Sequence, residues 1–163
     1  MNPIDLVAHG PVIPVIVLQR VEDAVPLARA LVDGGVRVLE VTLRTPVALQ
    51  CMEAIAKAVP QAIVGAGTVR NAADARAARD AGCQFAVSPG YLPSVGATRR
   101  ELGLRLLPGV ATSSEVMQAN ADGYDFLKFF PATAIGGIPL LKALAGPLTH
   151  LVFGPTGVIT PEP

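Results

Sequence analysis

The pattern that decides the fold of this chain is clearest in the stretch Gly34-Gly35-Val36-Arg37-Val38-Leu39-Glu40-Val41-Thr42-Leu43. Two glycines follow an alanine-rich segment of helical period, and a run of β-branched and aliphatic residues comes after them. Glycine is preferred at the left-handed end of a helix, and β-branched runs are typical of buried strands. Residues 47–59 return to a helical period. The stretch therefore predicts one strand between two helices.

The same alternation of strand and helix continues along the chain, at intervals of roughly 20 to 25 residues. Glycines again follow helical segments, at Gly82, Gly103 and Gly123, whereas Thr45-Pro46 and Thr112-Ser113 follow strands as N-caps would. Because the βα units repeat without a crossover gap, they favour a (β/α)8 barrel of the TIM type over a doubly wound sheet. The predicted strands are residues 12–18, 36–43, 62–69, 85–88, 104–107, 126–130 and 151–153, and the predicted helices are residues 22–32, 47–59, 72–81, 92–102, 114–121 and 138–144.

Seven strands cannot close the usual eight-stranded barrel, and the end of the sequence accounts for the difference. Thr160-Pro161-Glu162-Pro163 is a typical helix start, with threonine as the cap and proline at the first helical position, yet no helix follows. A barrel of this type typically needs about 200 residues or more, and the chain has 163. We therefore expect a single barrel domain over residues 1–163 in which the last βα unit is missing.

The composition excludes several classes of protein. Hydrophobic residues make up 51% of the chain and charged residues 16%, which excludes intrinsic disorder. Thirteen basic and thirteen acidic residues cancel, so the charge predicts no nucleic-acid partner and no membrane partner. The longest apolar run, at 12–18, is far shorter than the roughly 20 residues of a membrane span, and the N-terminus lacks a signal-peptide pattern. We expect a cytoplasmic protein. Cys51 and Cys83 lie far apart without a CxxC motif, and we expect buried thiols and no metal site.

The second predicted strand carries charged residues on one face. Its period-two alternation places Glu40, Thr42 and Arg44 together, near the C-terminal end of the strand. The C-terminal ends of barrel strands form the mouth in which barrel enzymes carry out their chemistry. Glu40 is therefore a candidate acid or base, and Arg44 is a candidate ligand for a carboxylate. A buried Glu–Arg pair with a purely structural role explains the same pattern.

The sixth predicted strand places a lysine inside an apolar run, Phe126-Leu127-Lys128-Phe129-Phe130. A single lysine rarely lies there without a partner or a function, although its side chain can also extend to the rim of the barrel. Burial favours the neutral amine, which is the form that attacks a carbonyl to give an imine. A lysine nucleophile, a glutamate on a neighbouring inward face and an arginine for a carboxylate fit class I aldolase chemistry at a 2-keto acid.

Two loops after strands are candidate ligand-binding segments. Gly65-Ala66-Gly67-Thr68 ends the third strand, where small residues let a ligand approach the backbone and Thr68 supplies a hydroxyl. Thr68 as an ordinary helix cap is the alternative. Gly154-Pro155-Thr156-Gly157 follows the seventh strand, and loops in this position commonly hold phosphate in barrels.

Six segments, in order along the chain, match one known family: Gly10–Val17, Gly34–Thr45, Ile63–Val69, Ser88–Gly90, Lys128–Ala132 and Pro155–Gly157. Together they resemble the 2-keto-3-deoxy-6-phosphogluconate (KDPG) aldolases, also called 4-hydroxy-2-oxoglutarate (KHG) aldolases. The Glu-Val-Thr-Leu-Arg-Thr and Lys-Phe-Phe-Pro-Ala runs are the most specific. The resemblance implies a homotrimeric (β/α)8 barrel enzyme that forms a covalent imine and uses no metal and no other cofactor. Its partners would be a small 2-keto acid and an aldehyde phosphate.

The resemblance also implies a role for each candidate residue. Lys128 matches the imine-forming lysine and Glu40 the general acid and base. Arg44 and Thr68 match residues near the pyruvate carboxylate, Phe130 helps to exclude water, and Thr156 with Gly157 matches the phosphate loop. The implied reaction cleaves KDPG to pyruvate and glyceraldehyde 3-phosphate. Cleavage of 4-hydroxy-2-oxoglutarate to pyruvate and glyoxylate is a second expected activity.

The sequence departs from the family at its C-terminal end. Val158 stands where the family has the second glycine of Pro-Thr-Gly-Gly, and a β-branched residue disfavours close approach of a phosphate. We expect the last strand of the family's barrel, which completes the phosphate site, to be missing from this chain. An alternative hypothesis is therefore a catalytically impaired barrel that acts as an oligomeric scaffold. A phosphate-binding isomerase or synthase is disfavoured, because such chemistry gives Lys128 no role.

Overall fold

A computed structural model describes residues 3–157 of the chain. In these residues strands alternate with helices, and every strand pair is parallel. Two 3-10 helices, η1 (Pro3–His9) and η2 (Val21–Asp23), precede the first long helix. The α-helices of the described residues are α1 (Ala24–Asp33), α2 (Ala48–Ala58), α3 (Ala72–Asp80), α4 (Pro93–Leu102), α5 (Ser113–Ala121) and α6 (Gly137–Ala145). The strands are β1 (Val15–Ile16), β2 (Val38–Thr42), β3 (Ile63–Gly67), β4 (Phe85–Val87), β5 (Arg105–Leu107), β6 (Gly109–Val110), β7 (Phe126–Phe129) and β8 (Val152–Pro155).

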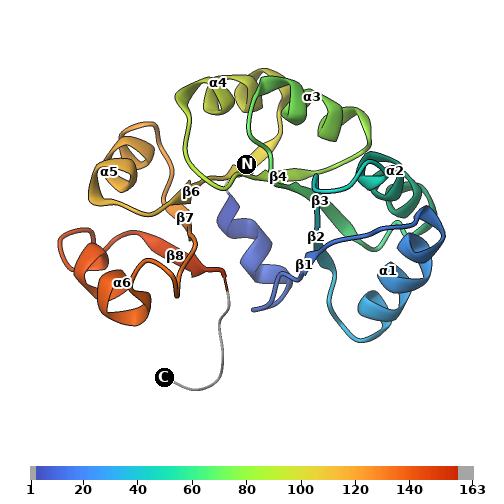
Figure 1. Ribbon diagram of the computed structural model, residues 1–163, viewed down its shortest axis with the longest axis horizontal. Helices are drawn as coiled ribbons and strands as arrows, with labels where there is room; N and C mark the ends of the chain where they lie inside the picture. Colours follow the sequence, from blue (N-terminus) through green and yellow to red (C-terminus); the bar gives the residue numbers. More distant parts are fainter. Residues whose placement is uncertain (1–2, 158–163) are drawn as a thin grey trace.

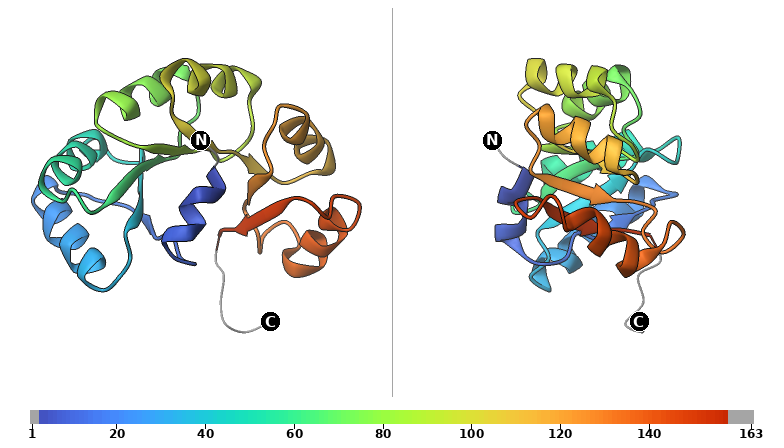
Figure 2. Two further views of the ribbon diagram at one scale, coloured as in Figure 1. Left: turned by 180° about the vertical axis from the view of Figure 1, so that it is seen from behind. Right: turned by 90° about the vertical axis from the view of Figure 1, so that its left-hand side faces the viewer.

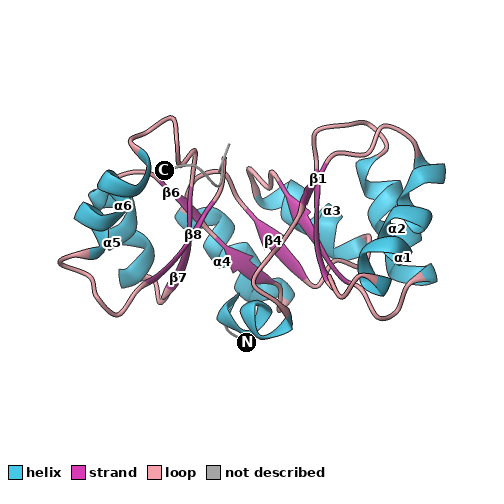
Figure 3. Cartoon of the chain, turned by 90° about the horizontal axis from the view of Figure 1, so that it is seen from below, coloured by secondary structure: helices cyan, strands magenta, loops and turns pink. Residues whose placement is uncertain are grey.

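The strands form a curved wall with the α-helices on its outer side (Figure 1). Strands β1 to β5 pair in chain order, and β6, β7 and β8 form a second parallel sheet in chain order. Figure 2 shows the same arc from behind, with η1 lying inside it and an opening between β1 and β8. In Figure 3, α1 and α2 lie at one flank and α5 and α6 at the other, with the strands between them. The predicted α/β barrel type is confirmed by this arrangement.

Two of the three hydrophobic clusters formed by residues 3–157 lie on opposite sides of the strands. The larger one lies between strands and helices, and the alanines on the inner sides of the helices let the helices pack closely against residues such as Leu39, Val41 and Leu127. The smaller core fills the inside of the arc with Leu6, Val38, Ile63, Phe85, Val87, Leu107 and Phe126. Leu6 belongs to η1, so the N-terminal helix contributes to the inner core. Strand β2 thus alternates between the two cores as its sequence predicts.

The fifth predicted strand differs from the structure in length and in partners. The sequence predicts one strand at 104–107, whereas the chain continues as a second short strand, β6, after Pro108. Proline has no N–H to donate to a ladder. Before this residue, β5 pairs with β4, and after it β6 pairs with β7. The fifth predicted strand is thus two short strands, so the seven predicted strands correspond to eight strands within residues 3–157.

The predicted helix ends are mostly confirmed. Gly35, Gly82, Gly103 and Gly123 have positive φ angles, as predicted, and Thr112 caps α5 in a capping box with Glu115. The prediction of Thr45 as a cap is wrong, because the Thr45 hydroxyl donates to the carbonyl of Leu18, 2.7 Å away. Asn71 caps α3 by accepting from the Asp74 amide. The predictions for Val158 and for the helix start at 160–163 lie outside the described residues.

No helix within residues 3–157 is long and apolar enough to cross a membrane.

Candidate active site

The structure brings Glu40 and Lys128 together inside the arc. Glu40 lies in the middle of β2 and Lys128 in the middle of β7, and the Lys128 Nζ lies 3.3 Å from the Glu40 Oε1. The two residues are 4% and 6% exposed. The hypothesis of a self-contained Glu40–Arg44 pair is thus replaced by a Glu40–Lys128 pair, which joins strands from the two sheets. Lysine at the rim, the alternative for Lys128, is wrong because Lys128 is buried.

The neighbours of Lys128 on both sides are glycines. In the parallel register, Lys128 lies beside Gly109 of β6 and Gly154 of β8. The space beside these two glycines is filled, because a Cβ atom at Gly109 would meet the backbone of Ser88 and Pro89, and one at Gly154 would meet the ring of Phe126. A cavity of about 580 Å³ lies beside the lysine, and its wall is formed by Glu40, Lys128, Thr156, Val7, Gly10, Pro11, Val12, Ile13, Leu107, Phe126, Gly154 and Pro155. A buried amine and a buried carboxyl thus face a cavity large enough for a small organic acid.

Burial controls the protonation of Glu40. Loss of contact with water raises the pKa of this carboxyl, and the charges of Lys128 and Arg44 partly oppose the shift. A carboxyl with a raised pKa can hold a proton at a pH where an exposed glutamate is ionised. Glu40 can therefore act both as an acid and as a base. The centroid of the Phe130 ring lies 5.3 Å from the Lys128 Nζ, which is within the range of a cation–π contact, and the ring covers one side of the amine.

Arg44 and Thr68 meet at the C-terminal ends of β2 and β3. The Arg44 Nε donates a hydrogen bond to the Thr68 Oγ1, 3.2 Å away. Thr68 has a φ angle of 63°, an unfavourable left-handed conformation for a β-branched residue. Such strain costs about 1–3 kcal/mol and clusters at functional sites. Thr68 does not cap α3, because Asn71 does. The alternative reading of Thr68 as a helix cap is therefore wrong.

Thr156 and Gly157 form the loop after β8, next to the loop that follows Lys128. The Thr156 amide donates to the carbonyl of Phe129, and the Thr156 carbonyl accepts from the amide of Ala132. Gly157 has a φ angle of 107°, which L side chains rarely adopt. Thr156 lines the same cavity as Glu40 and Lys128, whereas Gly157 is not among its lining residues.

The structure differs from the sequence prediction at two places in this region. Residues 10–13 line the cavity, although their sequence indicates no role beyond their place in the family pattern. The sequence predicts that Gly65 and Gly67 leave room for a ligand. The structure instead fills the space beside Gly65 with the ring of Phe85 and the space beside Gly67 with the side chain of Glu40.

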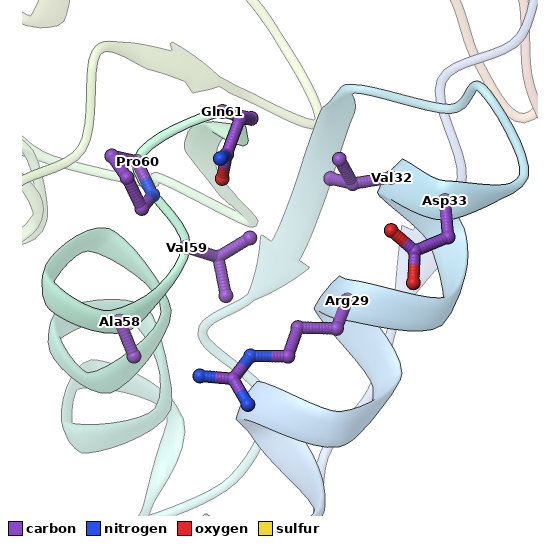
Figure 4. Close-up of a pocket in the computed structure, with 7 residues that line it drawn as sticks. All are labelled: Arg29, Val32, Asp33, Ala58, Val59, Pro60 and Gln61. Atoms are coloured by element: carbon purple, nitrogen blue, oxygen red, sulfur yellow. The ribbon is translucent and has the colours of Figure 1, made fainter.

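A second cavity, of about 430 Å³, lies away from these residues (Figure 4). It is lined by the C-terminal half of α1, the end of α2 and the turn after it, where Arg29, Asp33 and Gln61 are the polar groups. The C-terminal ends of helices lie at the end of a barrel opposite its catalytic mouth. This cavity therefore carries no part of the candidate site.

Within residues 3–157, no group of three or more histidine, cysteine, aspartate or glutamate side chains is placed to hold a metal ion. Cys51 and Cys83 are free and buried, as predicted from the sequence. Burial raises the pKa of the Cys83 thiol to about 12, so that this thiol stays protonated.

The raised pKa of Glu40 predicts a pH dependence of folding stability. Because the folded protein holds this proton more tightly than the unfolded chain, the stabilisation is complete below the unfolded pKa and is lost as the pH rises through the folded pKa. Urea unfolding of the wild type and of Glu40→Gln between about pH 4 and about pH 8 measures this pH dependence. As the pH rises, the free energy of unfolding of the wild type should fall relative to that of the variant, by at most about 1.4 kcal/mol per pH unit. A difference that grows in the opposite direction would refute the shift.

The sequence and the fold match one family of known proteins. The family model described as "KDPG and KHG aldolase" matches residues 4–163. The KHG/KDPG aldolase of Escherichia coli strain K12 is 51% identical over 156 residues, which cover 96% of this chain and 73% of that protein. The 2-dehydro-3-deoxy-phosphogluconate aldolase of Zymomonas mobilis is 50% identical over 162 residues, 99% of this chain and 77% of that protein.

A solved structure gives the same result for the fold. The KDPG aldolase of Legionella pneumophila, with pyruvate captured at low pH as a covalent carbinolamine intermediate, superposes with a TM-score of 0.94 at 46% identity. The match covers 98% of this chain and 77% of that one.

Proposed function

The chain belongs to the KDPG and KHG aldolase family, and we propose that Lys128 and Glu40 carry out its class I aldolase reaction. The substrate is KDPG, and the products are pyruvate and glyceraldehyde 3-phosphate. Cleavage of 4-hydroxy-2-oxoglutarate to pyruvate and glyoxylate is a second activity of the same site. The observation that carries the assignment of residues is the buried pair of Lys128 Nζ and Glu40 Oε1, 3.3 Å apart beside a cavity.

The first half of the reaction forms the imine. Glu40, whose Oε1 lies 3.3 Å from the Lys128 Nζ, accepts a proton from the ammonium, and the amine that results is free to attack. The amine attacks the C2 ketone of the substrate and forms a carbinolamine. Glu40 then returns its proton to the carbinolamine hydroxyl, which leaves as water. The product is a protonated imine on Lys128, which attracts electrons from C3.

The second half breaks the carbon–carbon bond. Glu40, now a carboxylate, takes the proton of the C4 hydroxyl, either directly or through a water molecule. The electrons of the C3–C4 bond move into the iminium, and the aldehyde leaves with its phosphate. The enamine that remains takes a proton at C3 and becomes the imine of pyruvate. Addition of water to this imine releases pyruvate and regenerates the free amine.

The other candidate residues bind the substrate in this proposal. Arg44 and Thr68, which touch each other at the ends of β2 and β3, hold the carboxylate of the 2-keto acid. Phe130, whose ring lies over the amine, excludes water from it. Thr156 and Gly157 hold the phosphate through the loop after β8. The reaction uses no cofactor, because the imine on Lys128 supplies the electron sink.

A cleavage assay tests the proposed function directly. Pyruvate released from KDPG is measured by its reduction with NADH and lactate dehydrogenase. The aldolase predicts steady release of pyruvate from KDPG, and a lower rate from the unphosphorylated analogue. Equal rates would show that Thr156 and Gly157 do not bind phosphate. No pyruvate from either substrate would favour the scaffold hypothesis, which no observation on the described residues supports.

The family resemblance also supports a homotrimer in the cytoplasm. Light scattering of the purified protein measures the mass of the assembly and tests the trimer.

A further inference from the structure

Gly67, the last residue of β3, has Glu40 directly against its backbone. A Cβ atom built on Gly67 would lie 2.4 Å from the Glu40 Oε1, 2.9 Å from its Cγ and 3.0 Å from its Cδ. These distances are shorter than non-bonded carbon and oxygen atoms tolerate. Any side chain at position 67 would therefore occupy space that the Glu40 side chain now fills.

The backbone of Gly67 does not require glycine for its conformation. Gly67 is absent from the described glycines with positive φ, and it lies in a regular strand. Thr42 is its partner in the parallel register, and the Leu43 amide donates to its carbonyl at 2.9 Å. The ladder thus fixes the position of Gly67 next to β2. What glycine provides here is space.

Gly65, two residues earlier on the same face, gives space to a different group. A Cβ atom at Gly65 would lie 2.2 Å from the ring of Phe85, a fully buried residue of the inner core. A side chain at 65 therefore collides with a rigid aromatic ring in a packed core. A side chain at 67 collides with the outer part of a flexible glutamate, which can rotate away.

We propose that Gly67 is a positioning residue for the general acid and base. The missing side chain lets the Glu40 carboxyl lie over β3, and this placement holds its Oε1 3.3 Å from the Lys128 Nζ. Gly67 itself touches no reacting atom and acts through Glu40. This inference rests on the proposed aldolase function.

The variant Gly67→Ala tests the inference through the exchange of the C3 protons of pyruvate. Because a shift of about 1 Å in a catalytic group can lower a rate about 10²-fold, we expect exchange to slow about 100-fold. The fraction of protein trapped by borohydride at saturating pyruvate should stay within about twofold, because Lys128 keeps its place. The matched control is Gly146→Ala, at the helical end of α6, where a Cβ has ordinary contacts of 3.6 Å and longer. It should exchange at the wild-type rate.

The effect of Gly67→Ala in a protein that already carries Glu40→Gln shows whether Gly67 acts through Glu40. If Gly67 acts through Glu40, adding Gly67→Ala to Glu40→Gln should change the exchange rate less than about threefold, because interacting sites are not additive. A further loss of about 100-fold in that background would overturn the proposal, as would wild-type exchange in Gly67→Ala alone. If Gly67→Ala fails to fold, Glu40→Ala with Gly67→Ala should restore folding. Failure of the double variant to fold would also overturn it. A wild-type protein without trapping or exchange refutes the proposed function instead.

Discussion

Lys128→Met will lose cleavage of KDPG by about 10⁴-fold or more, the scale of losses when a covalent nucleophile is removed. Methionine has a similar length and keeps the apolar part of the side chain, but it cannot form an imine. The measurement is the rate of pyruvate release from KDPG. The fold should persist, because Glu40 can take up a proton in its buried position once the lysine charge is gone.

Lys57→Met is the matched control for this variant. Lys57 lies on the exposed side of α2 and forms an ion pair there with Glu53, which contributes little to stability. Its loss should leave the cleavage rate unchanged. Retention of a substantial cleavage rate in Lys128→Met, with Lys57→Met equal to the wild type, would show that the reaction does not pass through an imine on Lys128.

Glu40→Gln should slow the exchange of the pyruvate C3 protons by about 10²-fold to 10⁴-fold, the usual contribution of a general acid or base. Glutamine has the same shape and can still accept a hydrogen bond from Lys128, but it cannot take up or return a proton. Pyruvate should therefore still be trapped as an imine at equilibrium. The measurement is the loss of the C3 proton signal of pyruvate in deuterated water.

Glu115→Gln is a control that changes a carboxyl outside the site. Glu115 accepts hydrogen bonds from the Ala111 and Thr112 amides at the start of α5, so its loss affects the cap of that helix. Exchange should match the wild type at a temperature where the variant is folded. Exchange by Glu40→Gln at the wild-type rate would remove Glu40 from the acid and base role.

Most of the fold could be predicted from the sequence, because the apolar runs, the helical periods and the glycines between them all indicate the same strands and helices. Buried parallel strands need continuous apolar runs, and β-branched residues supply them between alanine-rich helices. The sequence pattern does not show the division of the fifth strand, because a strand that changes partners at Pro108 looks like one short strand followed by a loop. It also does not show the partner of Thr45, because the Thr45 hydroxyl donates to the carbonyl of Leu18, a residue far away in the sequence.

The candidate site could be predicted in part. Lys128 and Glu40 stood out as charged residues in apolar strands, and alternation placed Glu40 correctly on the inner face. The sequence did not predict that these two side chains touch, since β2 and β7 belong to separate sheets. The role of Gly67 was not predictable, because what a glycine makes room for depends on the direction of a neighbouring side chain. The left-handed backbone of Thr68 is equally invisible to sequence patterns.

The most direct test of this account is the site at which pyruvate is trapped. The chain has three lysines, Lys57, Lys128 and Lys142, so reduction with borohydride in the presence of pyruvate can be mapped by peptide mass spectrometry. We expect one reduced pyruvyl adduct, on the peptide that contains Lys128. An adduct on Lys57 or Lys142 alone, or no adduct, would contradict this expectation.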